Sequence, residues 1–386
     1  MGFDLRTHGF TDSIISENLQ DLGDKLPKWE KIPYAVVKHN QTTLVEYLSS
    51  PLYDISGFIL PVYEWGTKIE EGTYGKIYLC KRKKYTQVES DNKLLYTGEN
   101  SPLIDIVIKE SDIYLSPAEL RMPEDIKKNI IQEETEAHIH EAAVLTLAYM
   151  AVKDKFPGSV PKVYEIFCKK NPDNTLKSLC IAMEYIKGDT LLRYLRKVLI
   201  KDGNNDDIYI DIIKQIAKII NILQNVLRMN HRDIKVNNIL LRQDSKQVVL
   251  IDYGFACIAN GVQEPAAEFS KIQAGSFFGS RHACFKRGRD ICQFLYSLHC
   301  YFPFEEYVSK PFYNLIQKWM LVPFKKGEAN LLNGLLDNGE PTEVRIKNLE
   351  YDEGIYLFLR KAEVDPILCS PEAVLADLEN FIIRAS

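Results

Sequence analysis

A chain of 386 residues is long enough for about two domains at roughly 150 residues each. Its hydrophobic residues (46%) and charged residues (26%) are in the proportions of an ordinary globular protein, and a net charge of -5 gives no sign of a nucleic-acid partner. No apolar run approaches the ~20 residues that cross a bilayer, and the N-terminal stretch is too polar for a signal peptide, so we expect no membrane partner. The eight cysteines are scattered without metal-ligand spacing, which favours an intracellular location, cytoplasmic or nuclear.

The first 62 residues carry no recognisable motif and mix short amphipathic stretches with prolines. Two interpretations stay open for this N-terminal extension. It is an extension packed on the domain that follows, or it is a regulatory or partner-binding arm.

From residue 58 onward, short apolar, aromatic and β-branched runs predict strands, which fall at residues 58–60, 77–80, 104–108 and 180–183. A polar stretch at 81–100 predicts a solvated hairpin loop or insertion, and residues 126–151 have helical character. Farther along, apolar residues recur at helical spacing, as in Ile212, Ile216 and Ile219. A strand-rich half followed by a helix-rich half predicts an α+β enzyme.

Two segments carry the chemistry of the chain. Residues 231–241 (HRDIKVNNILL) contain Asp233, Lys235 and Asn238, and residues 250–256 (LIDYGFA) contain Asp252. Two acids, an ammonium and an amide on neighbouring loops suit metal-assisted phosphoryl transfer, because that reaction needs a base, bound magnesium and cations around the phosphates.

These segments resemble the eukaryotic-type protein kinase superfamily, whose catalytic loop is H-R-D-x-x-x-x-N and whose metal loop is D-F-G. The resemblance implies a two-lobed fold, with a small β-rich lobe and hinge at 63–186 and a larger helical lobe at 187–386. It implies ATP and Mg²⁺ as cofactors and protein substrates as partners. Asp233 is then the catalytic base, Lys235 neutralises the transferred phosphoryl group, and Asn238 and Asp252 hold magnesium.

The same resemblance extends to the nucleotide site. Residues 69–77 (IEEGTYGKI) are similar to the kinase glycine-rich loop, with Glu70 in place of its first glycine. A G-x-x-G turn alone is equally typical of an ordinary hairpin. The nucleotide-binding residues implied here are Glu71, Gly72, Thr73, Tyr74, Gly75 and Ile77.

Lys109 ends an apolar run, as the phosphate-binding lysine of the family does, and Glu141 is its expected partner. Three other acids, Glu133, Glu134 and Glu136, compete for that role. Residues 183–186 resemble the hinge, where adenine would bond to the backbone of Glu184 and Ile186 beside Met183, and Asp189 would reach the ribose. The alternative is a plain buried strand followed by a Gly-Asp turn.

Lys235 resembles the Ser/Thr protein kinases, which place a lysine two residues after the catalytic aspartate. No A-P-E motif follows the metal loop; instead residues 275–280 and 289–291 loosely resemble the casein kinase and vaccinia-related kinase branch, in which Asp290 would anchor the catalytic loop. Two rival functions remain, a pseudokinase or scaffold and a small-molecule kinase. A composition rich in Ile, Lys, Asn and Tyr is typical of an AT-rich genome, such as that of a large DNA virus acting in a host cell.

Overall fold

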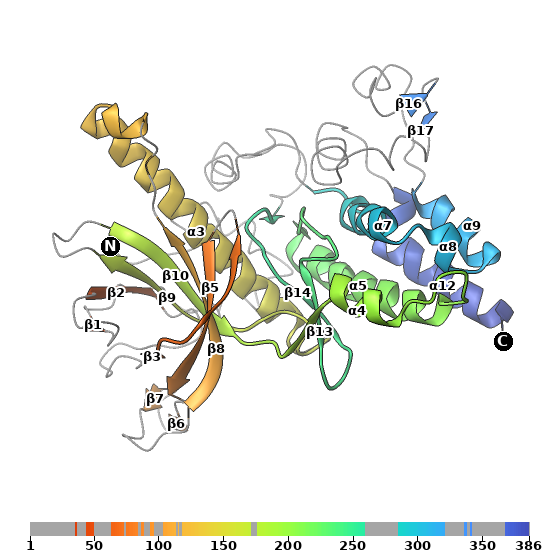
Figure 1. Cartoon of the computed structure of the whole chain (residues 1–386), viewed down its shortest axis with the longest axis horizontal. Helices are drawn as coiled ribbons and strands as arrows, with labels where there is room; N and C mark the ends of the chain where they lie inside the picture. Colours follow the sequence, from red (N-terminus) through yellow and green to blue (C-terminus); the bar gives the residue numbers. More distant parts are fainter. Residues whose placement is uncertain are drawn as a thin grey trace. The chain divides into compact units, whose positions relative to one another are not determined.

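The computed structural model divides the chain into two units, which are described one at a time (Figure 1). The first contains the described residues up to Met150 together with Pro161–Ile186. The second contains Ala151–Val160 and the described residues from Lys187 onward. The residues that the structure describes are 35–36, 44–49, 63–72, 75–83, 86–88, 93–95, 103–112, 115, 118–170, 176–258, 285–320, 336–337, 340–341 and 367–385.

The first unit is built on an eight-stranded antiparallel sheet. Its strands follow the order β1 (Ala35–Val36), β2 (Leu44–Ser49), β9 (Val163–Lys170), β10 (Leu176–Glu184), β8 (Leu103–Asp112), β5 (Gly75–Lys83) and β3 (Tyr63–Glu64), and β4 (Lys68–Gly72) also pairs with β5. The expected strands at 77–80, 104–108 and 180–183 lie within β5, β8 and β10, whereas residues 58–60 lie outside the described residues.

Two features of this sheet go beyond the sequence interpretation. The predicted loop at 81–100 contains a small hairpin, in which β6 (Thr86–Val88) pairs with β7 (Lys93–Leu95). Within the N-terminal extension, β2 pairs with the edge of β9. This part of the extension therefore adds strands to the sheet.

The side chains of β8 alternate between the two faces of the sheet. Ile106 and Ile108 are fully buried in a core cluster with Cys80, Cys180 and Ala182. Lys109 points to the opposite face, where it meets helix α3 (Glu124–Val152). Lys109 and its neighbour Glu110 therefore face opposite sides of the sheet.

Helix α3 follows a short 3-10 turn, η2 (Glu119–Arg121), and agrees closely with the helix expected at 126–151. Its C-terminal half supplies the buried residues Val144, Leu145 and Ala148. Its first turn is exposed, as Ile126 shows.

The second unit is mainly helical (Figure 1). Its helices are α4 (Leu191–Val198), α5 (Asp206–Leu227), α7 (Arg289–Tyr301), α8 (Phe304–Tyr307), α9 (Lys310–Met320) and α12 (Pro371–Ala385), with a 3-10 turn η4 (Ile367–Cys369). Three short sheets join β11 (Gly188–Thr190) to β13 (Ile239–Arg242) and β14 (Val248–Leu250), β12 (Met229–Asn230) to β15 (Cys257–Ile258), and β16 (Leu336–Asp337) to β17 (Glu340–Pro341).

The core of the second unit forms around α5, which packs against α7 and α12. Its apolar positions, among them Ile212, Ile216 and Ile219, are buried as their helical spacing predicts. Helix α12 is capped at its start, because the Ser370 hydroxyl accepts a hydrogen bond from the amide of Ala373 (3.4 Å).

One segment falls in a different unit from the one expected. Residues 151–160, assigned by sequence to the first lobe, belong with the second unit. Their backbone explains this, since the Ser159 carbonyl accepts from the Leu250 amide (2.9 Å) and the Gly158 carbonyl accepts from the Arg242 side chain (3.0 Å).

A β-rich first unit and a helical second unit confirm the predicted α+β class. None of the described helices is both long and apolar enough to cross a bilayer.

Candidate active site

The two loops that carry the motifs of the second unit are joined at both ends by short sheets. Strand β12 precedes the first loop and pairs with β15, which follows the second loop. Strand β13 ends the first loop and pairs with β14, which begins the second. The Ile251 amide also donates to the Asn238 carbonyl (3.1 Å). Asn238 and the residue before Asp252 are thus held side by side.

Asp290, at the start of α7, holds the backbone of the first loop in place through hydrogen bonds. Its carboxylate accepts from the amides of His231 and Arg232 (3.0 Å each) and from the side chain of Asn230 (3.0 Å). Asp290 is 1% exposed. A buried carboxylate is stable only when its oxygens accept hydrogen bonds, and here the amides of the first loop donate them.

His231 links the two loops. Its Nε2 lies 3.1 Å from the Ile251 carbonyl, and its ring packs on that of Tyr253 with centroids 4.5 Å apart. Burial lowers the pKa of His231, so the ring is neutral and Nε2 carries the hydrogen that is donated. His231 therefore serves to connect the two loops, and as a neutral buried ring it is not an acid or a base here.

Asp233 is at the centre of a polar cluster. Its Oδ2 accepts from the Asn238 amide nitrogen (2.7 Å) and lies 3.3 Å from the Lys235 ammonium. The Asn238 side chain also donates to the Asp233 backbone carbonyl (3.0 Å). Asp233 is 6% exposed. The structure therefore brings three of the four motif residues into direct contact.

Burial raises the pKa of Asp233 from 3.8 to about 7, and the nearby Asp252 carboxylate acts in the same direction. The Lys235 ammonium and the hydrogen bond from Asn238 oppose this rise. The carboxyl is consequently poised between its acid and base forms near neutral pH, a property suited to proton transfer.

The residues expected to hold magnesium fit that ion chemically. Because the Asn238 nitrogen donates to Asp233, its carbonyl oxygen is the atom left for a cation. Asp252 supplies carboxylate oxygens from a left-handed backbone conformation (φ 65°), which aspartate tolerates. Magnesium prefers such hard oxygens and completes its shell with phosphates and water. Among the described residues no three His, Cys, Asp or Glu side chains gather, so the fit rests on one amide and one carboxylate.

In the first unit, Lys109 and Glu141 form a close ion pair. The Lys109 ammonium lies 2.6 Å from the Glu141 carboxylate, and the two side chains are only 12% and 8% exposed. Glu133, Glu134 and Glu136 have side chains outside the described residues. The expected pairing of strand lysine and helix glutamate is therefore present in the structure.

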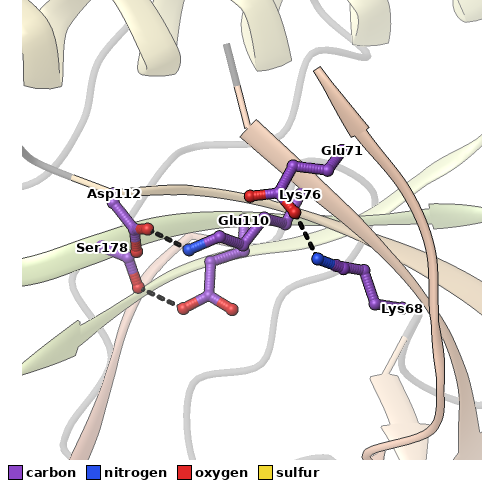
Figure 2. A network of polar contacts seen from close by, with 6 residues as sticks. All are labelled: Lys68, Glu71, Lys76, Glu110, Asp112 and Ser178. Carbon is purple, nitrogen blue, oxygen red and sulfur yellow. Dashed lines mark hydrogen bonds and ion pairs between the residues drawn. The ribbon is translucent and has the colours of Figure 1, made fainter. Parts of the chain in front are cut away.

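The glycine turn lies between β4 and β5, where Gly72 faces Gly75 and Glu70 faces Ile77. Thr73 and Tyr74, which the resemblance places in the nucleotide site, lie outside the described residues. The Glu71 carboxylate contacts the Lys68 ammonium, which lowers the pKa of Glu71 (Figure 2). Glu70, the departure from the family pattern, is exposed on β4.

The predicted hinge at 183–186 begins within the last two residues of β10 and continues beyond it. The Glu184 amide donates to the Lys162 carbonyl (2.8 Å), and its carboxylate accepts from the Lys162 amide (3.3 Å). Met183 is half-buried and Ile186 is buried. The side chain of Glu184 thus holds Lys162, the residue that immediately precedes β9.

Asp189, expected near the ribose, lies on β11 in the second unit. Its carboxylate accepts from the Lys197 ammonium (2.7 Å), and Arg193 lies 3.8 Å away. The hydrogen bond from Lys197 holds the pKa of Asp189 below its ordinary value. In this structure Asp189 is paired with α4, a partner that the sequence interpretation did not foresee.

Sequence reasoning also missed supporting residues from α7 and β12. The Ser297 hydroxyl accepts from the Val236 amide (3.1 Å), and Asn230 joins Asp290 to Lys286 by accepting from the Lys286 amide (2.6 Å). Asn230 immediately precedes His231, and that adjacency is the signal that could have identified it.

Replacing Asp290 with alanine should loosen the first loop. The amides of His231 and Arg232 would lose their acceptor, so we expect their hydrogen exchange to accelerate by about tenfold or more. Hydrogen exchange read by mass spectrometry on peptides spanning the loop measures this. Asp211→Ala, which removes an exposed acceptor on α5, is the control and should leave the loop unchanged. Equal protection in wild type and Asp290→Ala would contradict the anchoring role.

The metal-free protein should show an aspartate carboxyl that titrates near pH 7. Between about pH 4 and about pH 7 the unfolded chain loses the Asp233 proton while the folded chain retains it, so this group makes the protein less stable as pH rises through that window. Lys235→Met removes an opposing charge and should raise the pKa further. Carboxyl-carbon NMR, assigned with Asp233→Asn, follows the titration, and an Asp233 midpoint near pH 4 would refute the expectation.

Tyr253→Phe should stabilise the protein. The Tyr253 hydroxyl is buried and has no hydrogen-bond partner among the described residues. Removing it keeps the ring and relieves an unsatisfied polar group, so the free energy of unfolding should rise by about 1 kcal/mol. Tyr296→Phe is the matched control, because the Tyr296 hydroxyl donates to the Met320 carbonyl (3.0 Å) and its loss should destabilise. Urea denaturation decides the two signs; a less stable Tyr253→Phe contradicts the argument.

Comparison with known proteins agrees with this geometry. The family model for the protein kinase domain matches residues 119–280. The EKC/KEOPS complex subunit bud32 of Dictyostelium discoideum is 32% identical over 93 residues, which is 24% of this chain and 36% of that protein. The serine/threonine-protein kinase ppk25 of Schizosaccharomyces pombe is 38% identical over 79 residues, or 20% of this chain and 17% of that protein.

The chain thus spans well under two thirds of the length of these relatives. The matched region contains Asp233, Asn238 and Asp252 and the helix that carries Glu141. With both motif loops in place and the predicted α+β fold confirmed, the comparisons support a protein kinase domain over residues 119–280 of this chain.

Proposed function

We propose that this protein is an ATP-dependent protein kinase that transfers the γ-phosphate to Ser or Thr hydroxyls of protein substrates. The observation that carries the proposal is the cluster around Asp233, a buried carboxylate bonded to Asn238 and next to Lys235. The matches to the protein kinase domain and to a serine/threonine kinase support it.

In this proposal Asp233 accepts the proton of the substrate hydroxyl. Its raised pKa makes it a better base than an exposed aspartate once it is ionised, and Lys235 stabilises the ionised form. Lys235, with its side chain 26% exposed, also offers a cation to the phosphoryl group. Asn238 and Asp252 would hold magnesium, which neutralises charge on the ATP phosphates.

The first unit supplies the residues proposed to bind the nucleotide. Lys109, oriented by Glu141, offers a fixed and largely buried ammonium to the phosphates. The glycine turn allows backbone amides to approach them, and residues 183–186 offer backbone groups to adenine. Asp189, from the second unit, is proposed for the ribose, a role that requires the nucleotide to displace Lys197 from its carboxylate.

The preference for Ser and Thr rests on Lys235, whose position resembles that family branch, and on the printed name of one relative. We also propose an intracellular location, cytoplasmic or nuclear, from the scattered cysteines. The likeness to casein and vaccinia-related kinases stays a prediction, because residues 275–280 lie outside the described residues.

Transfer of labelled γ-phosphate from ATP to casein, myelin basic protein and the chain itself tests the proposal. We expect magnesium-dependent label on Ser or Thr. Asp233→Asn should reduce the rate by about 100-fold or more, since a general base contributes at least that factor. Asp252→Ala should abolish transfer, and both variants should keep the wild-type circular dichroism. Asp211→Asn, an exposed substitution on α5, is the matched control and should keep wild-type activity.

The other outcomes separate the rival functions. ATP binding without transfer to any acceptor would identify a pseudokinase, which Glu70 in the glycine turn would help to explain. Transfer to small alcohols but not to proteins would identify a small-molecule kinase. Full transfer by Asp233→Asn would refute the role assigned to that carboxylate.

A further inference from the structure

A set of polar contacts surrounds the sheet end next to the glycine turn (Figure 2). The Lys76 ammonium contacts the Asp112 carboxylate, and the Ser178 hydroxyl donates to the Glu110 carboxylate (2.7 Å). These contacts join β5 to β8 and β8 to β10. None of the four residues in these contacts is among those proposed to bind the nucleotide or to take part in catalysis.

Gly75 lies directly against the backbone of β8. A Cβ atom at this position would be 2.7 Å from the Glu110 carbonyl oxygen and 2.9 Å from the Ser111 hydroxyl, and the φ of Gly75 is 149°. Only glycine permits both the approach and the backbone conformation. The end of the turn is therefore seated on the residues that immediately follow Lys109.

The Lys76–Asp112 ion pair extends the contact between β5 and β8 beyond their last pair of opposed residues. Pairing of these strands begins at Lys76 opposite Glu110, and Asp112 lies two residues farther along β8 on the same face. The Lys76 side chain thus crosses diagonally to an acid that has no backbone partner on β5. Contact with Asp112 raises the pKa of Lys76, which keeps the ammonium charged.

Asp112 is itself held from the other side. Pairing between β8 and β10 extends to Asp112, which lies opposite Ser178. The buried Ser178–Glu110 hydrogen bond reinforces the same end, with Ser178 0% and Glu110 6% exposed. Asp112 is consequently held in place by β10, and its contact with Lys76 fixes the position of the start of β5.

We propose that Asp112 is a positioning residue for nucleotide binding, which through Lys76 holds the glycine turn at a fixed place relative to Lys109. This inference rests on the proposed function, since it assumes that the turn binds ATP. Asp112 does not touch the nucleotide. Because it places groups that bind ATP in the ground state and the transition state alike, its loss raises KM for ATP and leaves kcat unchanged.

A charge-swap cycle tests the proposal. Affinity for ATP with magnesium is measured by calorimetry for wild type, Asp112→Lys, Lys76→Glu and the double variant. Each single variant should bind about fivefold more weakly, the effect of an exposed ion pair of about 1 kcal/mol, and the double variant should return to within about twofold of wild type. Glu124→Gln, which breaks the Lys127–Glu124 pair on α3, is the matched control and should bind as wild type does.

The cycle also separates positioning from direct contact of Lys76 with phosphate. Direct contact predicts that the double variant stays as weak as Lys76→Glu, and that Asp112→Asn binds at least as tightly as wild type. Either result would overturn the proposal, as would single variants with unchanged affinity. Absence of ATP binding by the wild-type protein would instead refute the proposed function, and thermal melting of each variant confirms that it is folded.

Discussion

The buried carboxylate of Asp290 is the constraint on which the loop that carries Asp233 depends. It accepts hydrogen bonds from two consecutive backbone amides and from the Asn230 side chain, and all of these groups are buried. Arg232, one of the residues so held, has a left-handed backbone (φ 67°) that a non-glycine residue adopts only when its surroundings enforce it. The three bonds supply that enforcement and so determine where the next residue, Asp233, points.

The packing that holds the loop also sets the electrostatics of the site. Enclosing Asp233 among buried neighbours removes water from its carboxylate, and this is the largest reason that its pKa rises to about 7. Lys235 and Asn238 lower the pKa of Asp233 and so offset part of the rise that burial causes. The carboxyl can therefore still ionise near neutral pH. A loop held in place and a carboxyl with a raised pKa therefore both follow from the burial of this segment.

The sequence was sufficient for residues whose chemistry is carried by their local motif. Lys109 could be expected because it ends an apolar run, and Glu141 because its segment resembles the helix glutamate of the kinase family; the structure pairs the two. The partners of Asp189 could not be predicted, because its pairing with Lys197 depends on how β11 leads into α4. Strand β2 was missed as well, since its pairing with β9 joins residues more than a hundred positions apart and leaves no local pattern.

In both units, residues that a motif identifies are supported by residues from other parts of the fold. On β8 the strand's alternation sends Lys109 to one face, where it pairs with Glu141, and Glu110 to the other, where it accepts from Ser178. In the second unit the loop of Asp233 is held from α7 by Asp290, which the family resemblance indicated, and by Ser297, which no motif indicated. Groups that perform the chemistry must keep a fixed identity and spacing, and motifs record them. Groups that position them need only a complementary atom at the right place, which different elements can provide, and that place is defined by the fold.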